Sequence, residues 1–180
     1  MGGVRLLEWL VPSVVSETVD WDSVYREELP RIFGYFRYRA FDRATAEDLT
    51  SATFEKAWRA RDRYRSNRAA VSTWLLAIAR NVAIDHIRRM RPEVALEDGS
   101  ARDETTPETA ALRHAELRRL QALLGALPER ERELLALKYG AGATNRAIAK
   151  LTGLSESNVG TILHRTVESL RGRWDEGGGR

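Results

Sequence analysis

The chain has 180 residues, of which 29 are Lys or Arg and 26 are Asp or Glu, giving a formal net charge of +3. Its 43% hydrophobic and 31% charged residues are typical of a globular protein. No apolar run reaches the roughly 18 residues of a membrane span, and the absence of cysteine excludes disulfides, thiol switches and thiolate zinc sites.

The amino-terminal sequence MGGVRLLEWLVPSVV has no basic start and is interrupted by Glu8 and Pro12. It therefore does not have the pattern of a secretory signal, and we expect the protein to stay in the cytoplasm. Residues 1–19 are expected to form an amino-terminal extension. Its apolar residues are compatible with a docking helix or with a disordered segment.

Three helices are predicted in the first half of the chain, because apolar residues recur there at helical spacing. The first runs from Trp21 to Ala40. The second starts with the capping-box-like sequence Thr45-Ala-Glu-Asp48 and reaches about Arg61. After an arginine-rich loop, YRSNRAA, the third runs from about Ser72 to Met90.

The charge of the chain reverses after the third helix. Residues 56–91 include ten basic and two acidic residues, whereas residues 92–110 include six acidic residues and one basic residue. The net charges of these stretches are therefore +8 and −5. The acidic stretch has no apolar period and contains Pro92 and Pro107, which is the composition of a flexible linker. Such a reversal marks a functional division of the chain.

Helical periodicity resumes at Glu108 and continues to Leu124. Pro128 stands where the first residue of a further helix would be, and Gly140 ends that helix. The same second half continues with TNRAIAKLTGLSESNVGTILHRTVESL, which predicts two short helices joined by a tight turn.

The two short helices have recognisable ends. Thr144 and Ser155 are predicted N-caps, and Gly153 supplies the positive φ that ends the first helix. Val159 and Leu163 lie on one side of the second helix, leaving polar residues on the other. A helix divided in this way suits the major groove of DNA. The alternative is an ordinary helical hairpin whose outer face is polar because water covers it.

The sequence as a whole predicts an all-α protein, because no strand pattern is present. We expect two small helical domains joined by a flexible acidic linker, the second of which contains a helix-turn-helix. The predicted divisions are an extension at 1–19, a domain at 20–91, the linker at 92–107, a domain at 108–173 and a tail at 174–180.

Four motifs resemble an extracytoplasmic-function (ECF) sigma factor of bacterial RNA polymerase, which has only regions 2 and 4 of the sigma-70 family. They are AEDLTSATFEKAW, WLLAIARNVAIDHIRR, LPERERELLALKY and the helix-turn-helix ending in LHR, and they occur in the order of that family. The resemblance implies a non-enzymatic subunit that recruits core RNA polymerase to promoter DNA and opens the minus-ten element. It also implies an anti-sigma factor as a partner and no cofactor or metal.

The resemblance assigns three groups of residues. Family members dock on the polymerase clamp through the AEDL helix, although this chain has Ser51 and Ala52 where the family usually has Gln and Glu. The polymerase-binding residues are then Glu47, Asp48, Phe54 and Glu55. The minus-ten residues are Arg63, Tyr64, Arg65, Asn67, Arg68, Trp74, Arg80, Asn81, Arg88 and Arg91. The minus-thirty-five residues are Arg146, Ser155, Ser157, Asn158, Thr161, His164 and Arg165.

The residue types in these groups suit the chemistry of their expected partners. An extruded DNA strand needs cations for its phosphates and aromatic or polar side chains for its unstacked bases. Exposed acids facing a basic partner accelerate docking and set its register. In the recognition helix, Gly160 and Ile162 replace two cations common in the family, so we expect weaker phosphate anchoring there.

One alternative uses the same helix-turn-helix. A LuxR-like regulator would bind DNA through its carboxy-terminal hairpin without binding core polymerase as a sigma subunit. The basic stretch at residues 56–91 favours the sigma factor, because a dimerisation domain has no need of an arginine-rich helix and loop. An enzyme is the least favoured class, since no nucleophile and base pair, phosphate loop or metal cluster is recognisable.

Overall fold

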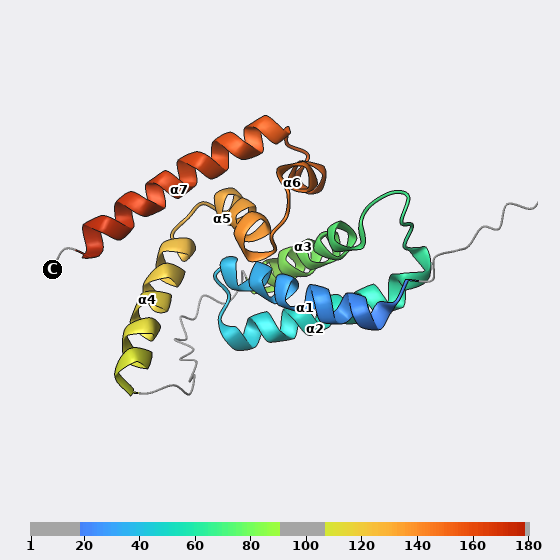
Figure 1. Ribbon diagram of the computed structural model, residues 1–180, viewed down its shortest axis with the longest axis horizontal. Helices are drawn as coiled ribbons and strands as arrows, with labels where there is room; N and C mark the ends of the chain where they lie inside the picture. Colours follow the sequence, from blue (N-terminus) through green and yellow to red (C-terminus); the bar gives the residue numbers. More distant parts are fainter. Residues whose placement is uncertain (1–18, 91–106, 179–180) are drawn as a thin grey trace, which may run out of the picture.

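The computed structural model describes residues 19–90 and 107–178. The predictions for most of the amino-terminal extension, for the linker and for Arg91 therefore lie outside the described residues. The described elements, drawn in Figure 1, are α1 (Trp21–Tyr38), α2 (Arg43–Ala60), the 3-10 turn η1 (Arg61–Arg63), α3 (Val71–Met90), α4 (Pro107–Gly125), α5 (Glu129–Leu135), the π-helical turn η2 (Ala136–Gly140), α6 (Asn145–Thr152) and α7 (Glu156–Gly178).

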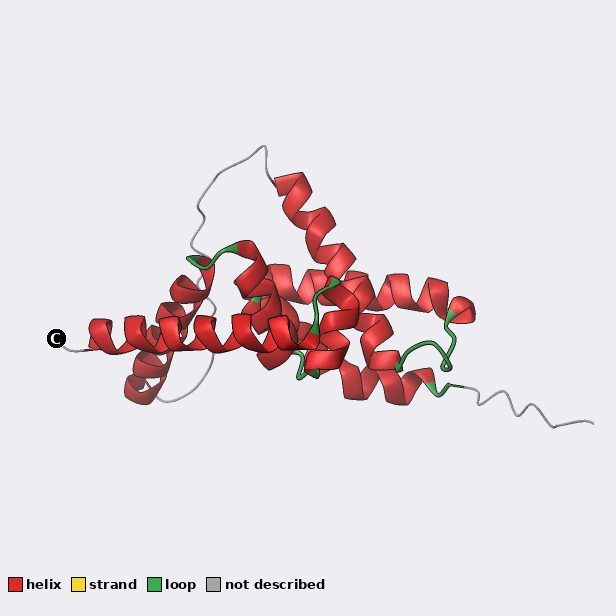
Figure 2. Ribbon diagram, turned by 90° about the horizontal axis from the view of Figure 1, so that it is seen from above, coloured by secondary structure: helices red, strands yellow, loops and turns green. Residues whose placement is uncertain are grey.

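The all-α prediction is confirmed, because the described residues form helices and loops without a strand (Figure 2). None of these helices is long and apolar enough to cross a membrane. The described part of the chain also has no cluster of three or more His, Cys, Asp or Glu side chains placed to hold a metal ion.

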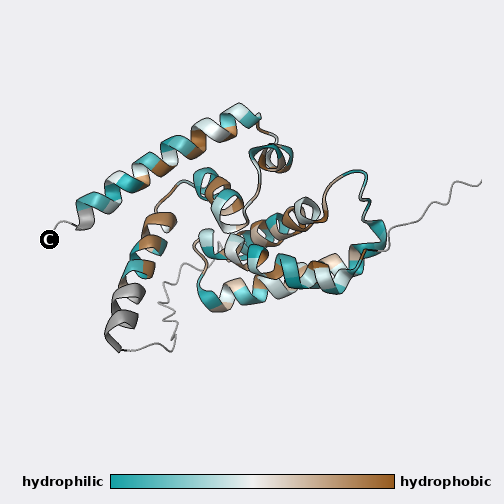
Figure 3. Ribbon diagram, viewed as in Figure 1, coloured by the Kyte–Doolittle hydropathy of each residue, from teal (hydrophilic) through white to brown (hydrophobic). Residues whose placement is uncertain are grey.

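Helices α1, α2 and α3 pack side by side and bury one face of each. Ile32 and Phe36 of α1 and Leu75 of α3 are fully buried, and Ala57 of α2 is almost so. Burial of such side chains from water stabilises the fold by about 1.5–3 kcal/mol for each large one. Figure 3 shows hydrophobic residues along α3, whereas much of α7 is hydrophilic.

The start of α2 differs from the prediction. The N-cap is Asp42, whose carboxylate accepts hydrogen bonds from the Thr45 amide at 2.9 Å and the Thr45 hydroxyl at 2.6 Å. The helix therefore begins at Arg43, and the capping-box interpretation of Thr45 was wrong. Partial burial opposes ionisation of Asp42, but the Thr45 hydrogen bonds outweigh it and hold the pKa of the carboxyl below its ordinary value.

The second half is built around α5 and η2. The buried side chains of Leu134 and Leu137 belong to these two elements, and α6 and α7 pack around them. Pro128 is the N-cap of α5 rather than its first residue. Helix α7 extends beyond the packed region to Gly178 (Figure 1), well past the predicted end of the second domain.

The two halves are in direct contact in this structure. Turn η2 lies against α1, and α6 lies against α3. The backbones of Gly34 in α1 and Gly140 in η2 are so close that a Cβ atom on Gly140 would lie 2.5 Å from the Gly34 carbonyl oxygen. A single hydrophobic core consequently runs from α1, α2 and α3 into α5, η2 and α6.

We predict that Asp42→Ala lowers the free energy of unfolding by about 1 kcal/mol, because it removes the side-chain cap of α2. Asp42→Asn is the matched control, since asparagine is an equally good N-cap. Because the folded-state pKa of Asp42 is depressed, the cap's contribution is present above the ordinary aspartate pKa and is lost as the pH falls through the folded value. Urea unfolding near pH 7 and near pH 3 measures both effects; equal stability of Asp42→Ala and wild type at pH 7 would contradict the prediction.

Candidate nucleic-acid interface

The helix-turn-helix is formed by α6 and α7, and its ends are capped as the sequence predicts. The Thr144 hydroxyl accepts the Ala147 amide hydrogen at 3.2 Å, and the Ser155 hydroxyl accepts that of Asn158 at 3.2 Å. Between them Gly153 has a φ of 76°, a left-handed conformation that a side chain would strain. These local interactions fix the angle at which α7 leaves the turn.

The predicted polar face of α7 is exposed. Val159 and Leu163 are buried against the rest of the second half, which turns the opposite side of the helix to solvent. That exposed side carries Ser157, Asn158, Thr161, His164 and Arg165. The structure thus brings five of the seven predicted minus-thirty-five residues to one surface. Ser155 instead serves as the N-cap of the helix.

The seventh residue, Arg146, makes an interaction that the sequence did not predict. Its Nε lies 3.0 Å from the Glu156 carboxylate at the start of α7, and both side chains are more than half exposed. An exposed ion pair of this kind contributes little to stability. The pair holds the Arg146 guanidinium beside the first turn of α7, the helix with the exposed polar face.

A second candidate surface is formed by the loop between η1 and α3. The Tyr64 hydroxyl donates a hydrogen bond to the Ala69 carbonyl oxygen at 3.0 Å, which closes the loop. The Tyr64 ring lies 5.2 Å from Trp74 and 6.0 Å from Trp21 between centroids. Partial burial raises the pKa of the Tyr64 phenol, so the hydroxyl stays a donor at neutral pH.

Trp21 was missed as part of this site. It is the first residue of α1, far from the loop in sequence, and its ring lies 5.8 Å from Trp74. No local pattern links residue 21 to residues 64 and 74, because their contact depends on how α1 packs. The loop presents the exposed side chains of Arg65, Asn67 and Arg68, and Arg63 at the end of η1 is exposed beside them.

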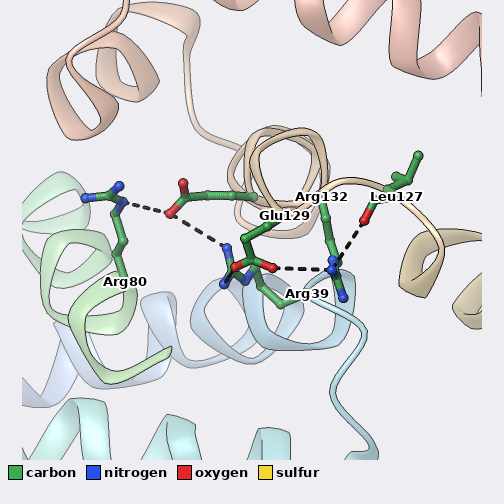
Figure 4. Close-up of polar contacts among 6 residues, drawn as sticks. Arg39, Arg80, Leu127, Glu129 and Arg132 are labelled. Atoms are coloured by element: carbon green, nitrogen blue, oxygen red, sulfur yellow. Dashed lines mark hydrogen bonds and ion pairs between the residues drawn. The ribbon is translucent and has the colours of Figure 1, made fainter. Parts of the chain in front are cut away.

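The predicted minus-ten residues of helix α3 lie in two different environments. Asn81 and Arg88 line a shallow hollow beside Lys56 of α2 and are exposed. Arg80, by contrast, points into the contact between the two halves, where its Nε lies 2.7 Å from the Glu133 carboxylate of α5 (Figure 4). The structure therefore does not expose Arg80 as it does the predicted minus-ten residues Arg63, Arg65, Asn67, Arg68, Asn81 and Arg88.

The predicted polymerase-binding residues lie along α2. Glu47, Asp48 and Glu55 are exposed, and Asp48 and Glu55 are seven residues apart, so they stand on one line of the helix. Glu47 and Glu55 form exposed ion pairs with Arg43 and Arg59. Phe54 is half-buried and packs edge-on against Tyr25 of α1, with 4.7 Å between ring centroids.

The two halves match two families of known domains. The family described as Sigma-70 region 2 matches residues 24–92, and the family described as Sigma-70, region 4 matches residues 117–170. Both matches fall on the units that carry the candidate surfaces, the first on α1, α2 and α3 and the second on the helix-turn-helix.

Several characterised proteins are similar along most of this chain. The ECF RNA polymerase sigma factor BldN of Streptomyces coelicolor is 27% identical over 170 residues, which are 92% of this chain and 64% of BldN. RNA polymerase sigma factor CarQ of Myxococcus xanthus is 31% identical over 154 residues, 84% of this chain and 87% of CarQ.

The fold is also similar to that of a solved complex. The sigma factor RpoE bound to the anti-sigma factor NepR, from Bartonella quintana, has a TM-score of 0.66 and 20% identity to this chain. The match covers 84% of this chain and 94% of that one. At this level of identity the likeness establishes a common fold.

Proposed function

Since the chain belongs to the ECF family of RNA polymerase sigma factors, we propose that it recruits core RNA polymerase to specific promoters and opens their minus-ten element. The observation that carries the proposal is the match of both halves to sigma-70 regions 2 and 4, in that order. A LuxR-like regulator accounts for the helix-turn-helix but not for the region 2 match. The proposal assigns no catalytic residue and no cofactor to the chain.

The proposed partners are bacterial core RNA polymerase, promoter DNA and an anti-sigma factor. The fold is shared with an RpoE whose solved structure includes the anti-sigma factor NepR, which supports the third partner. Because core polymerase and the chromosome of a bacterium lie in the cytoplasm, the proposal places this protein there.

The minus-thirty-five element is assigned to the exposed face of α7. A helix whose amino-terminal half is polar on one side and anchored by Val159 and Leu163 on the other fits the major groove. Asn158 and Thr161 offer hydrogen-bonding groups to base edges, and Arg165 offers the guanidinium that pairs with guanine or phosphate. The ion pair of Arg146 with Glu156 at the start of α7 supports a role for Arg146 as a further cation for the backbone of the same duplex.

The minus-ten element is assigned to the loop between η1 and α3. Its arginines are exposed on a loop that the Tyr64 hydrogen bond and the Trp21 and Trp74 rings hold in shape. Cations track the phosphates of a single strand, whereas aromatic rings and amides receive its bases. The exposed Asn81 and Arg88 extend this surface along α3.

Transcription in vitro tests the proposal directly. Purified protein is added to core RNA polymerase on genomic fragments, and the RNA products are sequenced at their 5′ ends. We expect defined start sites that depend on the added protein. A protein that binds DNA but neither binds core polymerase in a pull-down nor directs initiation would instead be a regulator of the LuxR-like type.

We predict that Asp48→Arg greatly reduces binding to core polymerase while the helical circular dichroism signal is unchanged. Asp48 is exposed and Asp42 is the N-cap, so the reversal removes an acid from the docking face without disturbing the helix start. Asp175→Arg at an exposed position of α7 is the control, because it changes the net charge equally. Undiminished binding by Asp48→Arg would remove this acid from the interface.

We predict that Arg165→Ala weakens promoter binding, and the form of the loss identifies the contact. A guanine contact costs about 1–3 kcal/mol, concentrated at one base pair, whereas a phosphate contact weakens all sequences alike and lowers the salt slope by about one unit. Titrations of promoter variants at several salt concentrations separate the two. Arg171→Ala, on the same helix and paired with Glu168, is the control. Wild-type affinity throughout would show that this face does not meet DNA.

We predict that Gly160→Lys tightens promoter binding. A side chain fits at this position, since an added Cβ would lie 3.6 Å from the Asn145 amide nitrogen. Gly160→Ala is the matched control, because alanine supplies the gain in helix propensity, about 1 kcal/mol, without the charge. The lysine variant should exceed the alanine variant in affinity, and its excess should shrink as salt rises. Equal affinities of the two variants would exclude a phosphate contact from residue 160.

A further inference from the structure

A pocket lined by aromatic rings lies between the start of α1 and the end of α2, two helices that pack side by side (Figure 1). Its volume is about 250 Å³. We call it the aromatic pocket, after the four rings that line it together with the buried Leu75 of α3: Trp21, Tyr25, Phe54 and Trp58. A concave site with such a lining takes an apolar ligand, because burial of apolar surface drives the binding.

Two of the four rings are exposed, although both are large aromatic side chains. Tyr25 is 49% exposed and Trp58 is 55% exposed. Single exposed apolar side chains are ordinary on a protein surface, but two aromatic ones around one pocket mark an interaction site.

Contacts within the described structure hold both exposed rings in place. The Tyr25 ring packs edge-on against Phe54, with 4.7 Å between centroids. The guanidinium of Arg61 lies 4.2 Å from the centroid of the Trp58 ring. The pocket is therefore formed in advance, which lowers the entropic cost of filling it.

An apolar stretch of the same chain lies close to this pocket in sequence. Eight of the twelve residues from 4 to 15 are Val, Leu or Trp. Residues 6–11 read LLEWLV, in which Glu8 is the one charged residue. A stretch of this composition gains free energy when an apolar site removes it from water.

The stretch is attached directly beside the pocket. Trp21, which lines the pocket, is the first residue of α1, and residue 11 stands ten positions before it. An extended chain covers about 3.3 Å per residue, so this connection spans up to about 33 Å. A short tether also holds its ligand at an effective concentration on the order of millimolar, so even weak apolar contacts fill the site.

We propose that residues 6–11 dock in the aromatic pocket of their own chain and cover Tyr25 and Trp58. The amino-terminal extension is then a part of the first helical unit. Docking also packs against Trp21, whose ring supports the loop between η1 and α3 through Tyr64 and Trp74. The inference goes beyond the proposed function and does not rest on it, because docking requires neither polymerase nor DNA.

Two added charges test the docking from the side of the pocket. Leu7→Asp with Leu10→Asp releases the segment, because an apolar pocket cannot solvate carboxylates, and neither residue belongs to a described helix. Gly2→Asp with Ser16→Asp is the matched control, since it changes the net charge equally outside residues 6–11.

The exposure of the pocket is measured by hydroxyl-radical footprinting of the full chain with mass spectrometry. We expect Tyr25 and Trp58 to be protected in wild type and in the control, and to lose that protection in the Leu7→Asp, Leu10→Asp variant. Tyr139 of the second half, which is 51% exposed, is the internal reference and should not change. Equal oxidation of Tyr25 and Trp58 in all three proteins would overturn the proposal.

Methyl NMR of the full chain tests the docking from the side of the segment. Methyl groups seated among aromatic rings are shifted by ring currents, so the Leu6, Leu7 and Leu10 signals should be displaced from their positions in an unfolded chain. Trp58→Ala should move them, whereas Tyr139→Ala, which removes a similarly exposed ring elsewhere, should not. Undisplaced signals that ignore Trp58→Ala would overturn the docking. Displacement that vanishes on dilution would assign the pocket to a second copy and overturn docking within one chain.

Discussion

The packing of turn η2 against α1 is the contact on which the rest of the described structure depends. It joins the two helical units, because α1 also forms the core with α2 and α3 and η2 continues directly from α5. The approach is close only because neither Gly34 nor Gly140 has a side chain. Gly140 is the last residue of the π-helical turn η2, in which each hydrogen bond spans one residue more than in an α-helix. This turn brings Gly140 against Gly34.

Helix α1 connects the candidate surfaces through its two ends. At its start, Trp21 supports the loop that carries the exposed arginines. At its end, Arg39 is buried between Glu129 and Glu133 of the second half. Burial raises the pKa of Tyr35 well above its ordinary range, so the phenol beside this cluster stays neutral. One rigid helix therefore spans from the proposed minus-ten surface to the contact with the second half.

Local signals in the sequence predicted local structure well. Thr144, Gly153 and Ser155 cap the helix-turn-helix as expected, because caps depend on residues within one turn of each other. The start of α2 was placed wrongly, since Asp42 outcompetes Thr45 as a cap and both types are good N-caps. The contact between the halves was not predicted. Residues 34 and 140 meet only through tertiary packing, and no periodicity in the sequence marks them. The domain boundaries and the roles of the site residues stay predictions.

The glycine contact and the ion cluster contribute to the interface in different ways. Removing charges from water is costly, so a buried ion cluster of this kind adds little net stability compared with apolar packing. Loss of one acid from the cluster would nevertheless destabilise the fold strongly. Arg39, which is 3% exposed, would then be a buried charge without a counter-ion. The cluster consequently selects one register of α5 on α1, in which each acid meets an arginine. The backbone approach of the glycines and the surrounding apolar burial supply the attraction that the cluster itself does not provide.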